Sequence, residues 1–105
     1  QVILNIFNNA LDEFEDKKIK NAILKIIGKE LNNDYIEITI SDNAGGIPQD
    51  IINKIFEPYF TTKFQSQGTG IGLYMSKVII TKHFNSKLEV YNSKNGAVFK
   101  IALFW

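Results

Sequence analysis

Apolar residues recur at helical spacing in two long stretches of the chain. The first stretch predicts an amphipathic helix over residues 1–16, because its apolar residues lie three or four positions apart. The expected buried stripe is Ile3, Phe7, Ala10 and Phe14. A second helix is predicted over residues 70–82, and its apolar stripe is Ile71, Tyr74, Met75, Val78 and Ile79. Each helix is therefore expected to pack by one face.

Two segments between these helices have the pattern of β-strands. β-branched residues dominate 22–29 and 35–41, and in the second segment isoleucine alternates with other residues. Residues 31–34 are the expected turn. The alternation predicts a strand that buries one of its faces.

The end of the chain has the pattern of a β-hairpin. Residues 87–91 and 97–104 are the expected strands, and they flank a Ser93-Lys94-Asn95-Gly96 turn. Asn-Gly is a pair suited to the positive φ angles of a tight hairpin turn. The hairpin would close the sheet.

One irregular stretch separates the two halves. Pro48 is well placed as the first residue of a short helix, which Pro58 would stop. The expected buried side of this helix is Ile51, Ile52, Ile55 and Phe56. Residues 59–69 show no periodicity. The order of elements predicts an α+β fold, a two-layer α/β sandwich with helices on one face of a mixed, mostly antiparallel sheet.

Length and composition fit one globular domain over residues 1–105. The chain has 45% hydrophobic and 22% charged residues, no cysteine, and no apolar run long enough to cross a bilayer. A formal charge of +1 gives no long-range attraction for nucleic acid or acidic lipid, so an anion would have to be held locally. Because Gln1 lies inside an apolar-periodic segment with no cap before it, we expect the domain to be truncated at its N-terminus.

The polar face of the first helix carries two asparagines. Asn5 and Asn9 are one helical turn apart, with Asp12 on the same face. An amide oxygen can ligate Mg²⁺, which takes one or two protein ligands besides substrate phosphates. Taken alone, these residues are better explained by a solvated helix face.

An acidic residue and two glycines follow the second strand. Asp42 could accept a hydrogen bond from an exocyclic amine, and Gly45 and Gly46 would let the backbone lie against a flat ring. A tight strand-to-helix turn is the alternative interpretation, because the same residue types favour it.

A second glycine cluster, Gly68-Thr69-Gly70-Ile71-Gly72, opens the second long helix. Its backbone N–H groups and the helix N-terminus could hold phosphate, although no strand precedes it as in the dinucleotide fingerprint. The aromatic segment before it ends at Lys63 and could act as a lid that offers Lys63 to phosphate. A flexible hinge and a surface loop are the alternatives.

Together, the four clusters resemble the ATP-binding catalytic domain of sensor histidine kinases, a Bergerat-type fold shared with gyrase, mismatch-repair and chaperone ATPases. The four matching boxes are Asn5-Ile6-Phe7-Asn8-Asn9-Ala10, Asp42-Asn43-Ala44-Gly45-Gly46-Ile47, Phe56-Glu57-Pro58-Tyr59-Phe60-Thr61-Thr62-Lys63 and Gly68-Thr69-Gly70-Ile71-Gly72-Leu73. They span nearly the whole chain.

The resemblance implies roles for individual residues, with ATP and Mg²⁺ as cofactors. Asn9 would ligate Mg²⁺ with Asn5 beside it, and Asp42 would receive the adenine amino group. Gly45 and Gly46 would line the same pocket. The residues expected at the phosphates or the lid are Lys63, Gly68, Thr69, Gly70, Ile71, Gly72 and Leu73. Family members often carry Lys and an aromatic residue where this chain has Asp12 and Glu13.

The resemblance also implies an activity and partners. The domain would transfer the γ-phosphoryl group of ATP to a histidine on a separate dimerisation domain, with a response regulator downstream. The location would be cytoplasmic, with no direct contact of this domain with nucleic acid or membrane. His83, the only histidine, is expected to be a structural residue at a helix end.

Two other activities of the same fold family remain open. One is an ATP-hydrolysing conformational switch, but such relatives carry a general-base glutamate where this chain has Asn5. The other is a serine-directed kinase, against which the aromatic segment argues.

Overall fold

The computed structural model describes residues 1–32, 34–60 and 71–104. The chain begins with helix α1 (Val2–Asp16) and continues into strands β1 (Leu24–Leu31) and β2 (Tyr35–Asp42). A 3₁₀ turn, η1 (Ile52–Lys54), precedes helix α2 (Gly72–Val78), which continues as a π-helical segment, η2 (Ile79–His83). Strands β3 (Lys87–Asn92) and β4 (Ala97–Phe104) end the described chain.

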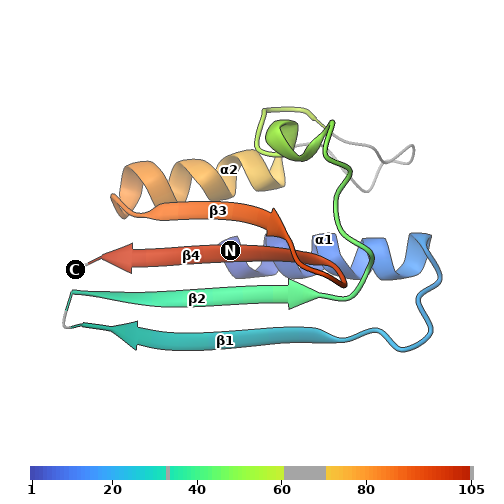
Figure 1. Cartoon of the computed structure of the whole chain (residues 1–105). Helices are drawn as coiled ribbons and strands as arrows, with labels where there is room; N and C mark the ends of the chain where they lie inside the picture. The colour runs from blue at the N-terminus through green and yellow to red at the C-terminus, as the bar shows by residue number, and fades with distance from the viewer. Residues whose placement is uncertain (33, 61–70, 105) are drawn as a thin grey trace.

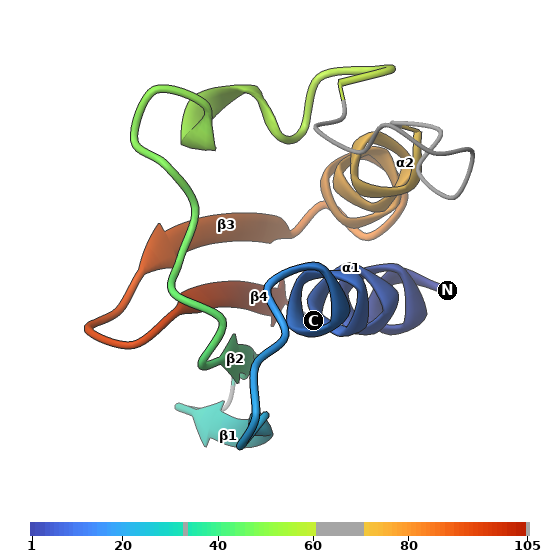
Figure 2. The same cartoon turned by 90° about the vertical axis from the view of Figure 1, so that its right-hand side faces the viewer.

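The strands form one sheet in the order β1-β2-β4-β3. All three pairings are antiparallel, and α1 and α2 lie on the same face of the sheet (Figure 1, Figure 2). The expected α+β sandwich with helices on one face of a mostly antiparallel sheet is confirmed. Within the described residues no helix is both long and apolar enough to span a membrane.

The main core lies between the helices and strands β2, β3 and β4. Ile40 of β2, Leu88 of β3 and Ile101 of β4 are almost completely buried there, together with Ile6 of α1. Of the alternating isoleucines of β2, Ile40 is buried and Ile38 is half-buried against the same core, so this face of the strand is turned toward the helices. In edge strand β1, Leu24 packs against this core, whereas Ile26 and Ile27 are exposed.

Burial corrects the expected stripe of α1. The buried residues are Val2, Ile6, Ala10 and Phe14, whereas Ile3 is 41% exposed. Both sets satisfy the helical period in this apolar segment, so the position of the sheet decides between them. Ala10 and Phe14 form a second cluster with Ala44, which joins α1 to the loop after β2.

The stripe of the second helix also differs from the prediction. Ser76 and Ile80 are its buried residues, and Met75 is 42% exposed. The helix changes to π geometry at Ile79, and this change rotates the faces of its last turn.

Two smaller elements are corrected as well. The helix expected from Pro48 is only the 3₁₀ turn η1, although Ile55 beside it is buried. The hairpin between β3 and β4 is present, but neither Asn95 nor Gly96 has a positive φ. Gly96 meets a different requirement, because a Cβ atom there would lie 1.9 Å from the backbone oxygen of Asp42.

Candidate functional site

A cavity of about 730 Å³ lies between α1, the chain that follows β2, and the beginning of α2. The start of β4 contributes Ala97 and Phe99 to its wall. This volume is in the range of pockets that bind small molecules and cofactors. The chain after β2 rises past the ends of β3 and β4 to the N-terminal side of α2, so residues distant in sequence meet here (Figure 1).

One face of α1 forms a wall of the cavity. Asn5, Asn9, Glu13 and Lys17 follow at four-residue intervals, and all four line the cavity. Residues at this spacing lie on one face of a helix, and the row extends about 18 Å along its axis. The expectation that the two asparagines share a polar face is confirmed.

Asn5 connects the beginnings of the two helices. Its Nδ2 donates to the carbonyl oxygen of Gly72 at 3.2 Å and to Oγ of Ser76 at 3.1 Å, and its Oδ1 accepts from Gln1 Nε2 at 3.3 Å. Ser76 is fully buried and donates its hydroxyl to Gly72 O at 2.9 Å. Asn5 therefore fixes the start of α2 against α1.

The first glycine cluster forms a loop after β2, which we call the glycine loop (Asp42–Ile47). Gly45 and Gly46 have φ angles of +90° and +88°, a region that side chains disfavour. A Cβ atom on Gly46 would lie 2.9 Å from Oδ1 of Asn92. Both the backbone angle and the close neighbour therefore require glycine at position 46.

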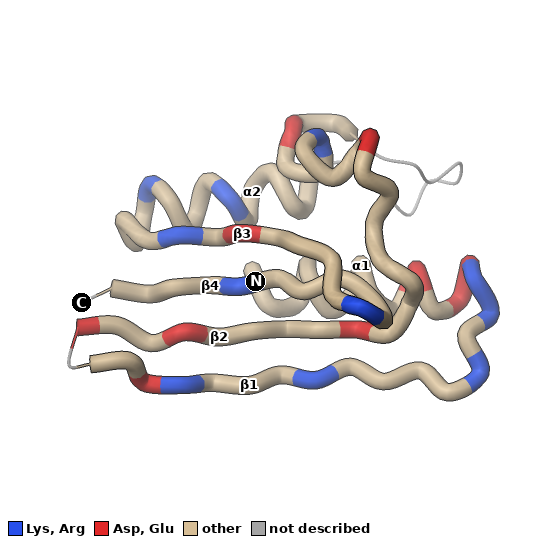
Figure 3. Tube along the Cα trace, viewed as in Figure 1, with Lys and Arg blue, Asp and Glu red and all other residues tan. Residues whose placement is uncertain are grey.

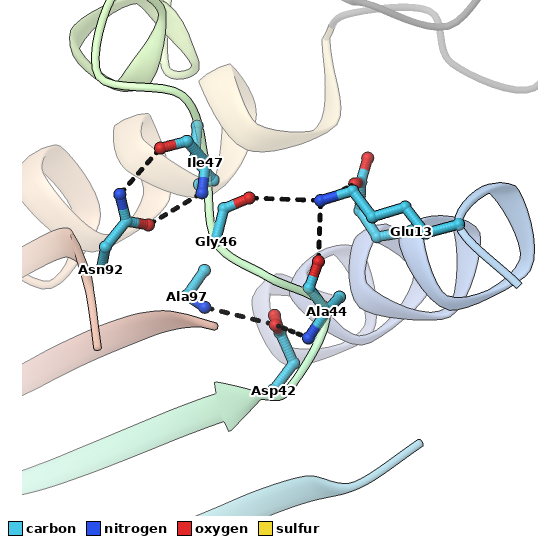
Figure 4. A network of polar contacts seen from close by, with 8 residues as sticks. Glu13, Asp42, Ala44, Gly46, Ile47, Asn92 and Ala97 are labelled. Carbon is cyan, nitrogen blue, oxygen red and sulfur yellow. Dashed lines mark hydrogen bonds and ion pairs between the residues drawn. The ribbon is translucent and has the colours of Figure 1, made fainter. Parts of the chain in front are cut away.

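Asn92, the last residue of β3, holds the end of the glycine loop. Its Oδ1 accepts from Ile47 N at 2.8 Å, and its Nδ2 donates to Ile47 O at 2.7 Å (Figure 4). The side-chain amide of Asn92 thus binds both backbone groups of Ile47, as a neighbouring strand would. The backbone N–H of Gly45 also donates to Asn95 O at 3.0 Å.

Asp42 holds the beginning of the loop. Its Oδ1 accepts from the backbone N–H of Ala44 at 3.0 Å and of Ala97 at 3.2 Å (Figure 4). Two N–H donors on one carboxylate oxygen fix the side chain where it lines the cavity. Asp42 is thus oriented by the protein itself.

Charge within the cavity comes mainly from carboxylates. Asp12, Glu13 and Asp42 line it, and Lys17 is the only lysine or arginine among the described lining residues. Acidic and basic positions lie close together near the C-terminal end of α1 (Figure 3). Lys17 pairs with Glu13 at 3.3 Å and donates to backbone carbonyls of the glycine loop.

The remaining wall is apolar. Ile47, Ile51 and Ile55 contribute to it, and Phe60 approaches from the aromatic segment. Phe56 of that segment packs edge-on against Phe99, with ring centroids 6.2 Å apart. A cavity with an apolar wall and a few fixed polar groups suits a flat heterocycle.

The structure brings most predicted site residues to one cavity. Those that line it are Asn5, Asn9, Asp42, Gly46, Ile71, Gly72 and Leu73. Gly45 belongs to the glycine loop but is not among the lining residues. Lys63, Gly68, Thr69 and Gly70 lie outside the described residues.

Lys17 and Asn92 were missed by the sequence analysis. Lys17 had a signal, because it continues the four-residue spacing of Asn5 and Asn9. Asn92 had none, since it is 45 positions from its partner Ile47.

The described part of the chain offers a metal ion few clustered ligands. Among the described residues there is no group of three or more His, Asp or Glu side chains that could hold one. This donor set fits Mg²⁺ carried largely by ligand phosphates, with an amide such as that of Asn9 as a protein ligand.

The fold and this cavity together define an ATP-binding domain of the histidine-kinase type. The family model of histidine kinase-, DNA gyrase B- and HSP90-like ATPases matches residues 1–104, so the chain belongs to this family.

Several relatives and solved structures are similar over nearly the whole chain. It is 38% identical to the sensor histidine kinase ZraS of Salmonella typhimurium over 104 residues, which are 98% of this chain and 21% of ZraS. It is 32% identical to the sensor protein FixL of Bradyrhizobium diazoefficiens over 103 residues, 98% of this chain and 20% of FixL. The chain thus spans about a fifth of these curated relatives.

The catalytic domain of the histidine kinase ThkA has the same fold, with a TM-score of 0.81 and 29% identity, over 99% of this chain and 65% of that one.

Proposed function

We propose that this chain binds Mg-ATP and transfers the γ-phosphoryl group to a histidine on a separate dimerisation domain. One observation carries the proposal: Asn9, Asp42 and Gly72 line a single cavity although they come from three distant parts of the sequence. Its volume of about 730 Å³ suits a nucleotide.

The adenine would bind at the glycine-loop end. Because both hydrogen bonds of Asp42 use Oδ1, the amino group of the base would bind at Oδ2. A base there would lie between the glycine loop and the apolar wall that includes Ile51 and Ile55. Its recognition rests on a carboxylate already oriented by the protein.

The phosphates would extend along α1 toward Asn9 and the beginning of α2. Asn9 would be a ligand of Mg²⁺, which neutralises phosphate charge when bound. Ile71, Gly72 and Leu73 line that part of the cavity, where the helix N-terminus favours an anion. Positioning and charge neutralisation are the main contributions an enzyme makes to phosphoryl transfer.

Asn5 argues for transfer to another protein group over hydrolysis. An amide cannot take a proton from water, and this amide is engaged with Gly72 and Ser76. The isolated chain is therefore expected to bind ATP without efficient turnover. The accepting histidine and the response regulator would belong to other domains or proteins.

Calorimetry with Mg-ATP, followed by a transfer assay, tests the proposal. Phosphoryl label should appear when the dimerisation helices of the parent protein are supplied, and it should be acid-labile and alkali-stable. His83→Gln serves as a control and should transfer label normally, because His83 is exposed at the end of η2. Steady ATP turnover by the isolated chain, or label that depends on His83, would contradict the proposal.

A further inference from the structure

Lys17 is the first residue after α1 and reaches across to the glycine loop. Its Nζ donates to the carbonyl oxygen of Ala44 at 2.7 Å and to that of Gly46 at 3.3 Å, and it pairs with Glu13 Oε2 at 3.3 Å. Its own backbone N–H donates to the carbonyl oxygen of Glu13 at 3.0 Å, and that of Lys18 donates to Glu15 O at 3.2 Å, so the helix end fixes the position from which the side chain starts.

The two carbonyl groups converge because Gly45 lies between them. The carbonyl oxygens of Ala44 and Gly46 both point toward the helix end beside Glu13 (Figure 4). A Cβ atom on Gly45 would lie 3.8 Å from Lys17 Nζ, so the ammonium group sits directly over this glycine. Two converging carbonyl dipoles form a site that a compact cation fills.

The loop is therefore held from two opposite structural elements. Lys17 of the α1 side contacts Ala44 and Gly46, and Asn92 of β3 binds both backbone groups of Ile47. Asp42 lies at the beginning of the same loop.

We propose that Lys17 is a positioning residue that holds the glycine loop at the distance from α1 at which Asp42 and Gly46 receive a purine base. The inference rests on the proposed function and deepens it, because it assigns base recognition partly to a residue that touches neither base nor phosphate.

The position of Lys17 separates it from the metal end of the cavity. It is twelve residues beyond Asn5 and eight beyond Asn9, or about 18 Å and 12 Å along the helix axis. A side chain that acts through the base-binding loop should influence a nucleoside as much as its triphosphate. This expectation distinguishes positioning from a direct phosphate contact.

The test compares Lys17→Met with Lys20→Met in the full chain. Lys20 is an exposed lysine three positions away and is the matched control. Affinities for Mg-ATP, Mg-ADP and adenosine are measured by calorimetry. Lys17→Met should weaken all three by a similar factor of about five, because a charged donor to two carbonyls is lost at a partly exposed site. Lys17→Arg should restore most of the affinity, and Lys20→Met should leave it unchanged.

Amide hydrogen exchange without nucleotide gives a second readout. Lys17→Met should speed exchange at Ala44, Gly45 and Ile47 while the amides of β2 keep their protection. The side chain of Lys17 is 40% exposed, so the variant is expected to fold, and its unfolding midpoint checks this.

Three results would overturn the inference: unchanged nucleotide affinity in Lys17→Met, a loss several times larger for ATP than for adenosine, or unchanged exchange in the loop. Failure of the proposed function looks different, because the unsubstituted chain and Lys20→Met would then bind no nucleotide. That outcome also removes the base-binding half of the inference, and the exchange comparison still decides whether Lys17 holds the loop.

Discussion

The two ends of the cavity are held together in different ways. At one end the glycine loop is fixed by Lys17, Asn92 and Asp42, side chains from three elements. At the other end, within the described residues, Asn5 joins α1 to Gly72 and Ser76 at the start of α2. The first end is held by several side chains, and at the second the described contacts between the helices centre on the amide of Asn5 and the buried hydroxyl of Ser76.

Because of this difference, substitutions at the two ends should affect different properties of the protein. The groups of the glycine-loop end are already satisfied inside the protein, so its substitutions should lower stability even without ligand. At the end near Asn9, bound Mg²⁺ and phosphate are expected to add contacts. Substitutions there should show mainly in binding.

The largest expected effect tests the glycine-loop end by adding one methyl group. Gly96→Ala should destabilise the domain by about 3 kcal/mol, because overpacking against fixed groups is costly. The new Cβ would lie 1.9 Å from Asp42 O and 2.6 Å from Asp42 Oδ1. Urea unfolding measures the change.

Gly28→Ala is the matched control on edge strand β1, where a Cβ atom would meet nothing within 4 Å. It should leave stability unchanged or slightly raised, since alanine restricts the unfolded chain. Equal unfolding midpoints for Gly96→Ala and Gly28→Ala would show that the hairpin turn can move away from Asp42. The glycine-loop end would then not be fixed as described.

A binding defect with little loss of fold would characterise the other end. Asn9→Ala should weaken Mg-ATP binding by about 10- to 100-fold, the range seen when support of a metal site is removed. Adenosine affinity should stay close to that of the unsubstituted chain, because the loop is untouched. Calorimetry with and without Mg²⁺ separates the metal-dependent part of the affinity from the part that the base contributes. An unchanged Mg-ATP affinity would reject Asn9 as a metal ligand.

Base choice should depend on Asp42. A carboxylate accepts from the amino group of adenine and faces the oxygen of guanine unfavourably, so ATP should be preferred over GTP by about 1–3 kcal/mol. In Asp42→Asn, the remaining oxygen can still accept from Ala44 and Ala97, which keeps the loop in place.

Competition binding with both nucleotides measures this preference before and after the substitution. If Asp42→Asn leaves the ratio of ATP to GTP affinity unchanged, residues other than Asp42 recognise the base.

The sequence predicts an element well when its hydrophobic pattern is compatible with only one set of bounds and buried residues. The predicted bounds of strand β4 are confirmed, because turn residues mark its beginning and an apolar run follows them. In α1 the predicted burial of Ala10 and Phe14 is confirmed, but the first two buried positions are Val2 and Ile6, one residue before those predicted, since the first turns are apolar on several sides. Such a choice depends on where the sheet lies, which is tertiary information.

The candidate site divides in the same way. Asn9, Asp42 and Gly72 could be found because their motifs follow the chain, and the cavity brings them together. Gly96 was predicted for a backbone angle that it does not have, and its real constraint is the nearness of Asp42. Contacts between residues far apart in sequence have no local pattern to reveal them.

The smallest predicted effect tests such a long-range contact. Asn92→Ala removes both hydrogen bonds to the backbone of Ile47 and should lower stability by about 1 kcal/mol, since this end of the loop is only partly buried and water can replace part of what is lost. Asn53→Ala, an exposed asparagine of η1, is the control and should change stability by less than about 0.5 kcal/mol. Because the same loop carries Asp42, ATP affinity should fall in Asn92→Ala and remain unchanged in Asn53→Ala. Equal free energies of unfolding and equal ATP affinities for the two variants would mean that Lys17 and Asp42 alone position the glycine loop. The hydrogen bonds to β3 would then contribute nothing to the difference between the two ends of the cavity.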